Sequence, residues 1–211
     1  MNLKIINNYR SSLDMNRIPK DYKPTVDEVK KYINKWNDLE NYVNQEEALD
    51  YLFGDKCRYN NDIREVLIKC CALNDFYSTN IFDIHSVAQH ILKLDIDERM
   101  EKGDLSLVND IAHVKVGNPK SPRFFYSFAT KYCSHHQPEK YAIYDRYVEK
   151  LLMEFKKRDK FSMFTLKDLK NYERYMAVIR DFQCHYGLTQ FTLKQLDHYL
   201  WQLGKENYNF Y

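Results

Sequence analysis

The chain is poor in the residues that form tight turns, since its 211 residues include only five glycines and five prolines. An all-β sandwich or barrel of this length needs many such turns. The scarcity therefore favours an all-α fold, and we expect about eight to ten helices within one helical domain over residues 1–211. Residues 1–22, rich in Asn and Arg, are expected to form a loosely attached N-terminal arm.

The sequence also lacks the patterns of membrane, exported and metal-binding proteins. No run of about 18 apolar residues occurs, and the start MNLKIINNYRSSLD has no apolar stretch before a cleavage site. The five cysteines show no CxxC spacing, and the histidines show no paired spacing with acids or thiols. We therefore expect a cytoplasmic protein with free thiols, no metal, no cofactor and no membrane contact.

The chain has almost no excess of positive or negative charge, because its 32 basic and 30 acidic residues give a net charge of only +2. Aromatic residues make up 15% of the chain, which excludes the composition of a disordered protein. Between residues 115 and 160, however, the sequence contains eleven Lys and Arg residues but only five acidic residues. This local excess could form a surface that contacts phosphates, although an ordinary solvated face has the same composition.

Apolar residues recur at helical spacing along most of the chain, and capping residues mark where helices begin. Thr25, Asp145, Thr165 and Thr192 are expected to start helices, and Gly187 and Gly204 to end them. The expected helices cover about residues 25–40, 45–53, 63–74, 79–94, 105–111, 122–135, 146–159, 165–185 and 193–203. VGNPKSP, residues 116–122, predicts a turn or hairpin loop, and no segment convincingly predicts a strand.

A lysine and an aspartate form the most informative pair. Lys131 lies among aromatic residues, where loss of water lowers the pKa of an amine and makes it a nucleophile. Asp145 follows fourteen residues later at an expected helix N-terminus, where backbone N–H groups and the helix dipole keep a carboxylate charged. The plainer roles are that Asp145 only caps its helix and that Lys131 only reaches water or a nearby acid.

Around this pair the sequence resembles the helix-hairpin-helix DNA glycosylase superfamily. The similar residues are SFATK at 127–131, Pro138, AIYD at 142–145 and Val148, together with LDHYLWQLGKE at 196–206. EVLIKCCALNDFYSTNIFD, residues 65–83, is similar to the central helix of these enzymes and the polar break after it. The resemblance runs over roughly residues 60–206 and is strongest to the bacterial 8-oxoguanine DNA glycosylase-like branch.

The resemblance implies a two-lobed helical bundle with the site between the lobes, and a monomer that acts on double-stranded DNA with a damaged base. It implies that Lys131 attacks C1′ of an oxidised purine nucleoside after base flipping, that a Schiff base forms, and that Asp145 assists. Asn74 would enter the duplex beside the unpaired base, and a phosphate grip would come from Lys115, Gly117, Lys120 and Arg123. His135, Tyr199 and Trp201 would line the base pocket.

Each of these residues also has a plainer role. Asn74 could break a helix, His135 could lie at a frayed helix end, and Tyr199 and Trp201 could belong to the core. Two other functions also remain open. One is a non-catalytic helical module that binds DNA or protein, and the other is hydrolysis in which Asp145 activates water and Lys131 acts only through its charge.

Overall fold

The computed structural model describes residues 18–115, 123–208 and 210, and the described chain is all-α apart from one short hairpin. Its helices are α2 (Val26–Asn37), α3 (Glu40–Asp50), α4 (Ile63–Phe76), α5 (Ile84–Leu94), α6 (Asp97–Glu101), α7 (Ser106–Ala112), α8 (Tyr126–His136), α9 (Arg146–Asp159), α10 (Tyr172–Tyr186) and α11 (Leu193–Asn207). Tyr51–Lys56 form a π-helical turn and Asp168–Lys170 a 3₁₀ turn. The strands are β1 (His113–Val114) and β2 (Arg123–Phe124).

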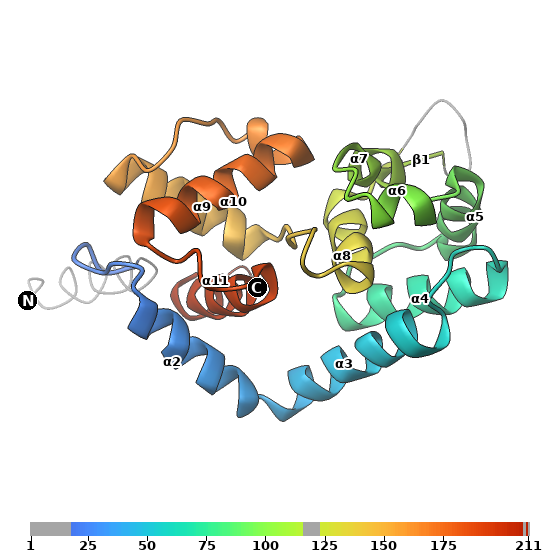
Figure 1. Cartoon of the computed structure of the whole chain (residues 1–211), viewed down its shortest axis with the longest axis horizontal. Coiled ribbons are helices and arrows are strands. Elements are labelled where there is room, and N and C mark those ends of the chain that lie inside the picture. The colour runs from blue at the N-terminus through green and yellow to red at the C-terminus, as the bar shows by residue number, and fades with distance from the viewer. Residues whose placement is uncertain (1–17, 116–122, 209, 211) are drawn as a thin grey trace, which may run out of the picture.

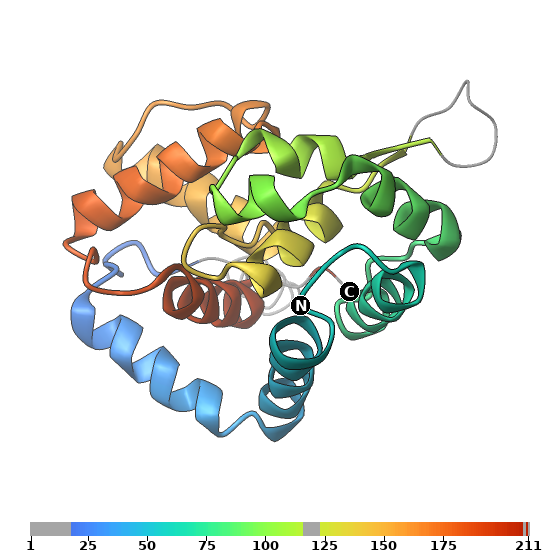
Figure 2. The ribbon, with the colours of Figure 1, turned by 45° about the vertical axis from the view of Figure 1, so that its right-hand side comes forward.

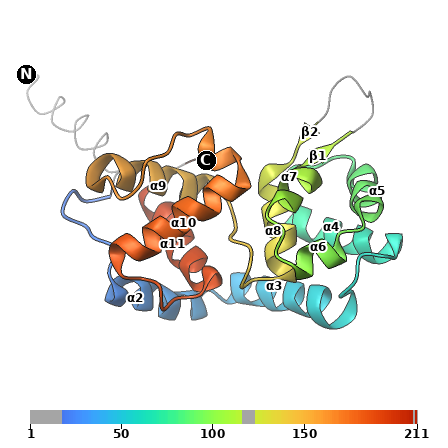
Figure 3. The same ribbon diagram turned by 45° about the horizontal axis from the view of Figure 1, so that its top comes forward.

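The helices form two groups side by side (Figure 1). One group contains α4 to α8 with the hairpin, and the other contains α2, α9, α10 and α11. Helix α3 runs beneath both and joins α2 to α4, and Figure 3 shows the same division from another side. Figure 2 shows α2 and α3 meeting at an angle below the other helices. Both groups share one buried core, which also includes Ile18 and contacts between α7 and α10.

Four helix boundaries that depend on local capping lie where the sequence predicts them. The side chains of Thr25, Asp145 and Thr192 each accept hydrogen bonds from backbone N–H groups at the starts of α2, α9 and α11. Thr192 and Gln195 form a complete capping box. Gly187 ends α10 in the left-handed conformation, as expected.

Other boundaries were predicted wrongly. Helix α3 begins at Glu40 and not near residue 45, and a π-helical turn, Tyr51–Lys56, follows it directly. Helix α5 begins only at Ile84, where Asp83 caps it, and α10 begins at Tyr172 because Asn171, not Thr165, is its cap. Thr165 instead holds the 3₁₀ turn through Asp168.

Gly204 does not end α11, which continues to Asn207. A Cβ atom at this position would lie 2.6 Å from the Cβ of Tyr147 on α9. The glycine is therefore required by the close packing of α11 against α9, and not by a helix end.

The segment before α8 is a β-hairpin and not the start of a helix. Val114 pairs with Arg123 and His113 with Phe124 in an antiparallel register, and α8 begins at Tyr126. The prediction of a helix from residue 122 and of a chain without strands was wrong here, because a pairing of two residues leaves no periodic pattern in the sequence. The predicted turn at 116–122 lies outside the described residues.

An extended, buried segment at 141–144 joins α8 to α9 and passes between the two groups of helices. The hydroxyls of Tyr172 and Tyr175 on α10 donate to the carbonyl oxygens of Ala142 (2.9 Å) and Ile143 (2.6 Å). From the other side, Thr130 Oγ1 accepts from Tyr144 N at 3.1 Å, and Ser127 Oγ donates to Tyr144 O at 3.1 Å. Side chains from two helices thus satisfy a buried backbone that has no sheet partner.

We expect Tyr175→Phe to lower the free energy of unfolding by about 1–3 kcal/mol, because it leaves the buried carbonyl of Ile143 without a donor. Urea denaturation measures the change. Tyr59→Phe, at a side chain that is 53% exposed, is the matched control and should leave the stability unchanged within about 0.5 kcal/mol. Equal stability of the Tyr175 variant and the wild type would show that this bond does not hold the segment.

Candidate functional site

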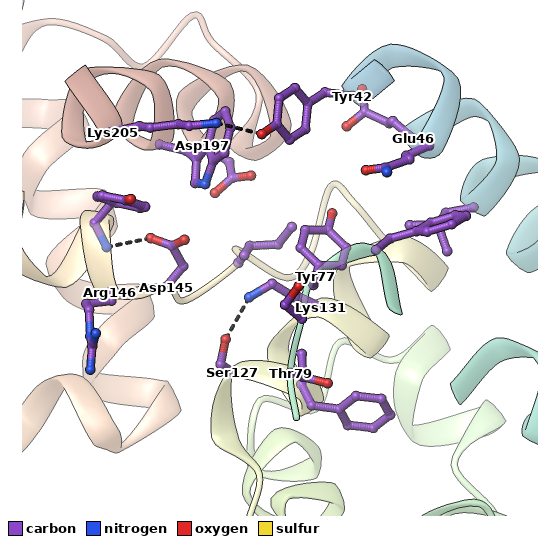
Figure 4. Close-up of a pocket in the computed structure, with 18 of the residues that line it drawn as sticks. Tyr42, Glu46, Tyr77, Thr79, Ser127, Lys131, Asp145, Arg146, Asp197 and Lys205 are labelled. Atoms are coloured by element: carbon purple, nitrogen blue, oxygen red, sulfur yellow. Dashed lines mark hydrogen bonds between the residues drawn. The ribbon is translucent and has the colours of Figure 1, made fainter. Parts of the chain in front are cut away.

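A cavity of about 630 Å³ lies between the two groups of helices. Its walls come from α2 and α3, the loop after α4, the start of α8, the loop before α9, and α11, and Figure 4 shows their side chains converging on it. The volume is within the range of sites that bind small molecules or single groups of a larger substrate. Lys131 and Asp145, the pair predicted from the sequence, both line it.

Lys131 points into this cavity from α8 and is only 5% exposed. Its Nζ donates to Ser127 Oγ at 2.6 Å and to Tyr144 O at 3.4 Å, and it lies 5.0 Å from the ring centre of Tyr77. No carboxylate among the described residues forms an ion pair with it. Burial lowers the pKa of Lys131, although the charges of Asp145 and Asp197 partly oppose this.

Asp145 reaches the cavity from the N-terminus of α9. Its Oδ1 accepts hydrogen bonds from Tyr147 N at 2.7 Å and Val148 N at 3.0 Å. These two bonds satisfy backbone N–H groups in the first turn of α9 that have no partner within the helix. The backbone of the preceding residue, Tyr144, is hydrogen-bonded to the side chains of Ser127 and Thr130 on α8. These bonds set the position of Asp145 relative to α8.

Asp197 is a third ionisable group of the cavity, and the sequence reasoning missed it. It lies on α11, and its buried Oδ1 has no hydrogen-bond partner. Burial raises the pKa of this carboxyl to about 7, and the charge of Asp145 acts in the same direction. The signal in the sequence is an acid one helical turn before Trp201 on a helix whose other face is apolar.

Two further polar atoms of the cavity wall are buried without partners within the described residues: Trp36 Nε1 and Tyr126 Oη. An indole N–H and a phenol O–H can each donate to a ligand, and Asp197 can accept. Buried polar groups are normally satisfied, so these three atoms can bind water or the polar groups of a ligand inside the cavity.

Aromatic rings form one wall of the cavity. Trp201 packs edge-on against Trp36 and Tyr42, with ring centres 5.8 and 4.9 Å apart. Lys205 lies 4.6 Å from the ring centres of both Tyr42 and Trp201. Trp201 therefore lines the predicted pocket and offers a ring to a planar ligand.

Tyr199 does not line the cavity. It is fully buried in the core, its hydroxyl shares a hydrogen bond of 3.0 Å with Tyr22, and its ring packs against Tyr32. Helical spacing explains the difference, since Tyr199 lies two residues from Trp201 and faces the other side of α11. The prediction placed both on one wall, and the structure separates them.

His135 also lies outside the lining, one layer behind Tyr77. Its Nε2 is 2.9 Å from the Tyr77 hydroxyl, and its Nδ1 is 3.5 Å from Asp50 Oδ1. Burial lowers the pKa of His135, which favours the neutral ring. The histidine thus holds the tyrosine whose ring faces Lys131 and does not itself project into the cavity.

Asn74 lies at the end of α4 as predicted, but its side chain is fully used within the following loop. Oδ1 accepts from Ile81 N at 2.9 Å and Thr79 Oγ1 at 2.8 Å, and Nδ2 donates to Ile81 O at 3.2 Å. These bonds make Asn74 the residue that shapes the loop, and they would have to break before the amide could enter a DNA duplex. The role of Asn74 in DNA binding stays a prediction.

The predicted phosphate-binding residues are only partly described. Lys115 follows β1, Arg123 lies in β2, and both are exposed. Gly117 and Lys120 lie outside the described residues. In the described part of the chain, no cluster of His, Cys, Asp and Glu could hold a metal ion.

A second buried lysine, Lys69 on α4, provides a comparison. Its Nζ donates to the carbonyls of Cys57 and Tyr59 and to Asn60 Oδ1, at 2.6–2.9 Å. Burial lowers the pKa of this amine to about 8. Three oxygens occupy the amine of Lys69, whereas Lys131 has one close acceptor and an open cavity before it.

A model of the protein family HI_0787_N, described as an N-terminal domain, matches residues 28–140. The matched range begins in α2 and ends just after α8, so it includes Lys131 but not Asp145. An uncharacterized protein of Haemophilus influenzae is 54% identical over 134 residues, which is 63% of each chain. The chain therefore spans less than two thirds of the length of that relative. No solved structure gives a significant match.

No helix in the described ranges has the length and apolar character needed to cross a membrane.

The buried carboxyl of Asp197 should make stability depend on pH. Its pKa is about 7 in the fold against an ordinary value of 3.8, so the folded chain holds the proton more tightly. The free energy of unfolding therefore falls as the pH rises from about 4 to 7, and the loss remains above pH 7. We expect Asp197→Asn to be more stable than the wild type at pH 8, by roughly 2–4 kcal/mol, and to lose this advantage near pH 4.

Urea denaturation at the two pH values measures the difference. Asp55→Asn, which changes an exposed carboxyl group, is the control. Its effect on the free energy of unfolding should be small and the same at pH 4 and pH 8. A gain for Asp197→Asn that is the same at pH 4 and pH 8 would contradict the raised pKa.

Proposed function

We propose, from the geometry of the cavity, that this member of the HI_0787_N family is a DNA repair glycosylase with AP lyase activity. Its substrate is double-stranded DNA with an oxidised purine of the 8-oxoguanine type. It acts as a monomer in the cytoplasm. The resemblance of SFATK and AIYD to helix-hairpin-helix glycosylases supports the proposal from the sequence side.

The observation that carries the proposal is the state of Lys131. A buried amine with a lowered pKa, one close hydroxyl partner and an open cavity before it is suited to attack an electrophilic carbon. The carboxyl groups of Asp145 and Asp197 line the same cavity, as does that of Glu46. Amine and carboxyl groups thus meet where a flipped nucleotide has room to bind.

The reaction proceeds in two stages. The lone pair of Lys131 Nζ forms a bond to C1′, and the C1′–N9 bond breaks with its electrons going to the base, which takes up a proton. Nζ releases one proton, and its lone pair then opens the C1′–O4′ bond while O4′ is protonated, so that a protonated imine remains between Nζ and C1′. Loss of a proton from C2′ then breaks the C3′–O3′ bond and releases the 3′ phosphate.

The two carboxyl groups have different tasks in this scheme. Asp145, oriented by hydrogen bonds from Tyr147 N and Val148 N, stabilises positive charge that develops on the sugar. Asp197, with a pKa of about 7, can accept or return a proton near neutral pH. Trp201 offers its ring to the flipped base, while Lys115 and Arg123, with Gly117 and Lys120, contact phosphates. The chemistry needs only protein side chains and water.

We expect Lys131→Gln to abolish covalent trapping by borohydride, which adds hydride to C1′ of the imine and makes the link permanent. The assay uses duplexes that each contain one lesion: 8-oxoguanine, an abasic site, uracil or hypoxanthine. Lys205→Gln removes an exposed lysine of the same cavity and should keep trapping within about twofold, because that amine is held by Tyr42 and Trp201.

The outcomes separate the possible functions. Trapping that survives Lys131→Gln would refute the assignment of the nucleophile. Base release without any trapping would indicate hydrolysis with water activated by Asp145. Neither release nor trapping on any lesion would leave a non-catalytic helical module that binds DNA or protein.

The pH dependence of trapping tests the state of the amine. Because burial lowers the pKa of Lys131, the single-turnover trapping rate should rise with pH and approach its plateau at a lower pH than for an ordinary lysine, whose pKa is 10.5. The charge of Asp145 raises this pKa, so Asp145→Asn should move the plateau to lower pH. Rates from pH 6 to 10 measure both. A rate that still rises about eightfold between pH 9 and pH 10 would show an ordinary amine.

A further inference from the structure

Ser127 is the closest polar partner of the Lys131 amine among the described residues. It lies one turn earlier on the same face of α8, and its Oγ accepts from Nζ at 2.6 Å. Thr130, the next hydroxyl of this face, is used elsewhere, since its Oγ1 donates to Ser127 O at 2.9 Å and accepts from Tyr144 N at 3.1 Å. The orientation of the amine therefore depends on the hydroxyl of Ser127.

The hydroxyl of Ser127 has one proton, and the buried carbonyl of Tyr144 accepts it. Ser127 Oγ donates to Tyr144 O at 3.1 Å, whereas Nζ of Lys131 lies 3.4 Å from the same oxygen. If Ser127 turned its proton toward Nζ, Tyr144 O would keep only the longer of these two contacts, and a buried carbonyl with a poor donor lowers the free energy of unfolding. Ser127 is thus held as a donor to the backbone and an acceptor toward the amine.

This direction of the hydroxyl proton determines what remains free on Nζ. A neutral amine has two N–H donors and one lone pair. Both donors have acceptors in the wall, namely Ser127 Oγ and Tyr144 O. The lone pair then points away from these two oxygens and toward the cavity, at whose edge Figure 4 shows Nζ. A hydroxyl that donated to Nζ would instead occupy the lone pair and prevent attack on carbon.

The same bonds exclude Ser127 as the route by which Lys131 loses its proton. The proton of Ser127 faces a carbonyl oxygen, which accepts a hydrogen bond but is too weak a base to take the proton. The proton of the ammonium must therefore leave through the cavity. Besides Tyr77, whose ring faces the amine, the ionisable side chains there include Glu46, Asp145, Arg146, Asp197 and Lys205. With a pKa of about 7, Asp197 is suited to accept it near neutral pH.

We propose that Ser127 is a positioning residue, whose hydroxyl holds Nζ of Lys131 with its lone pair directed into the cavity. The reaction of this amine, attack on C1′, rests on the proposed function, but the hydrogen bond exists in the protein without DNA. Its removal should have two opposite effects on reactivity. The ammonium loses an acceptor that stabilises its charge, so its pKa falls, while the neutral amine loses its orientation.

The first measurement follows the amine in the protein alone. NMR titration of the Lys131 Cε resonance, assigned by its absence in Lys131→Gln, gives the pKa of this group. Ser127→Ala should lower the titration midpoint by about 0.5–1 pH unit, because a hydrogen bond to a charged group is stronger than one between neutral groups. Ser127→Thr keeps a hydroxyl and should restore the wild-type midpoint. An unchanged midpoint in Ser127→Ala overturns the proposal even if trapping succeeds.

Thr130→Val is the matched control for effects on the backbone. It removes the other hydroxyl bond to Tyr144 but no contact of Lys131. This variant should therefore lower the free energy of unfolding and leave the midpoint of Lys131 unchanged. A midpoint that moves equally in Thr130→Val and Ser127→Ala would show that Ser127 acts only through the backbone, and would refute the proposal.

Single-turnover borohydride trapping is the second measurement. Ser127→Ala should lower the plateau rate about tenfold although it approaches the plateau at a lower pH, and Ser127→Thr should stay within about twofold of the wild type. An unchanged plateau rate in Ser127→Ala would contradict the positioning role. A lowered midpoint in the titration without trapping by any protein, including the wild type, would support the position of the amine and place the failure in the proposed chemistry.

Discussion

The arrangement of the site depends on how the backbone between α8 and α9 is satisfied. This segment is buried without a strand beside it, so side-chain hydroxyls of Thr130, Ser127, Tyr172 and Tyr175 take the place of a sheet ladder. The first two lie on the same face of α8 as Lys131, and Asp145 follows directly after the segment. The bonds that join the two groups of helices are therefore also those that set the amine and the carboxylate at one cavity.

The two buried lysines show how their surroundings determine what a desolvated amine can do. Both lose water on folding, but Lys69 is surrounded by oxygens that link the π-helical turn to α4. Lys131 has instead a hydroxyl and an aromatic face, and it borders polar atoms that lack partners. Burying an amine without enough hydrogen-bond acceptors lowers the free energy of unfolding. Such a loss of stability is common where a site is shaped for a substrate.

The sequence was sufficient where a feature depends on a few neighbouring residues. The caps at Thr25, Asp145 and Thr192 and the helix end at Gly187 are local hydrogen-bonding choices, and all were predicted correctly. Asn74, Tyr199 and Asp197 could not be assigned in this way, because their surroundings come from contacts across the fold. The helical class was predictable from composition, whereas the hairpin of β1 and β2 was too short to leave a pattern. The glycosylase chemistry stays a prediction from resemblance and geometry.

The close approach at Gly204 has a consequence for the shape of the cavity. Helix α11 carries Asp197 and Trp201, and it rests on the first turn of α9, which Asp145 begins. Any larger residue at 204 would place its Cβ 2.6 Å from the Cβ of Tyr147, which is too close for van der Waals contact, so the two helices would have to move apart. The wall with the tryptophan would then move away from the wall with the capping aspartate. The spacing between opposite sides of the site is thus fixed by a residue that does not line it.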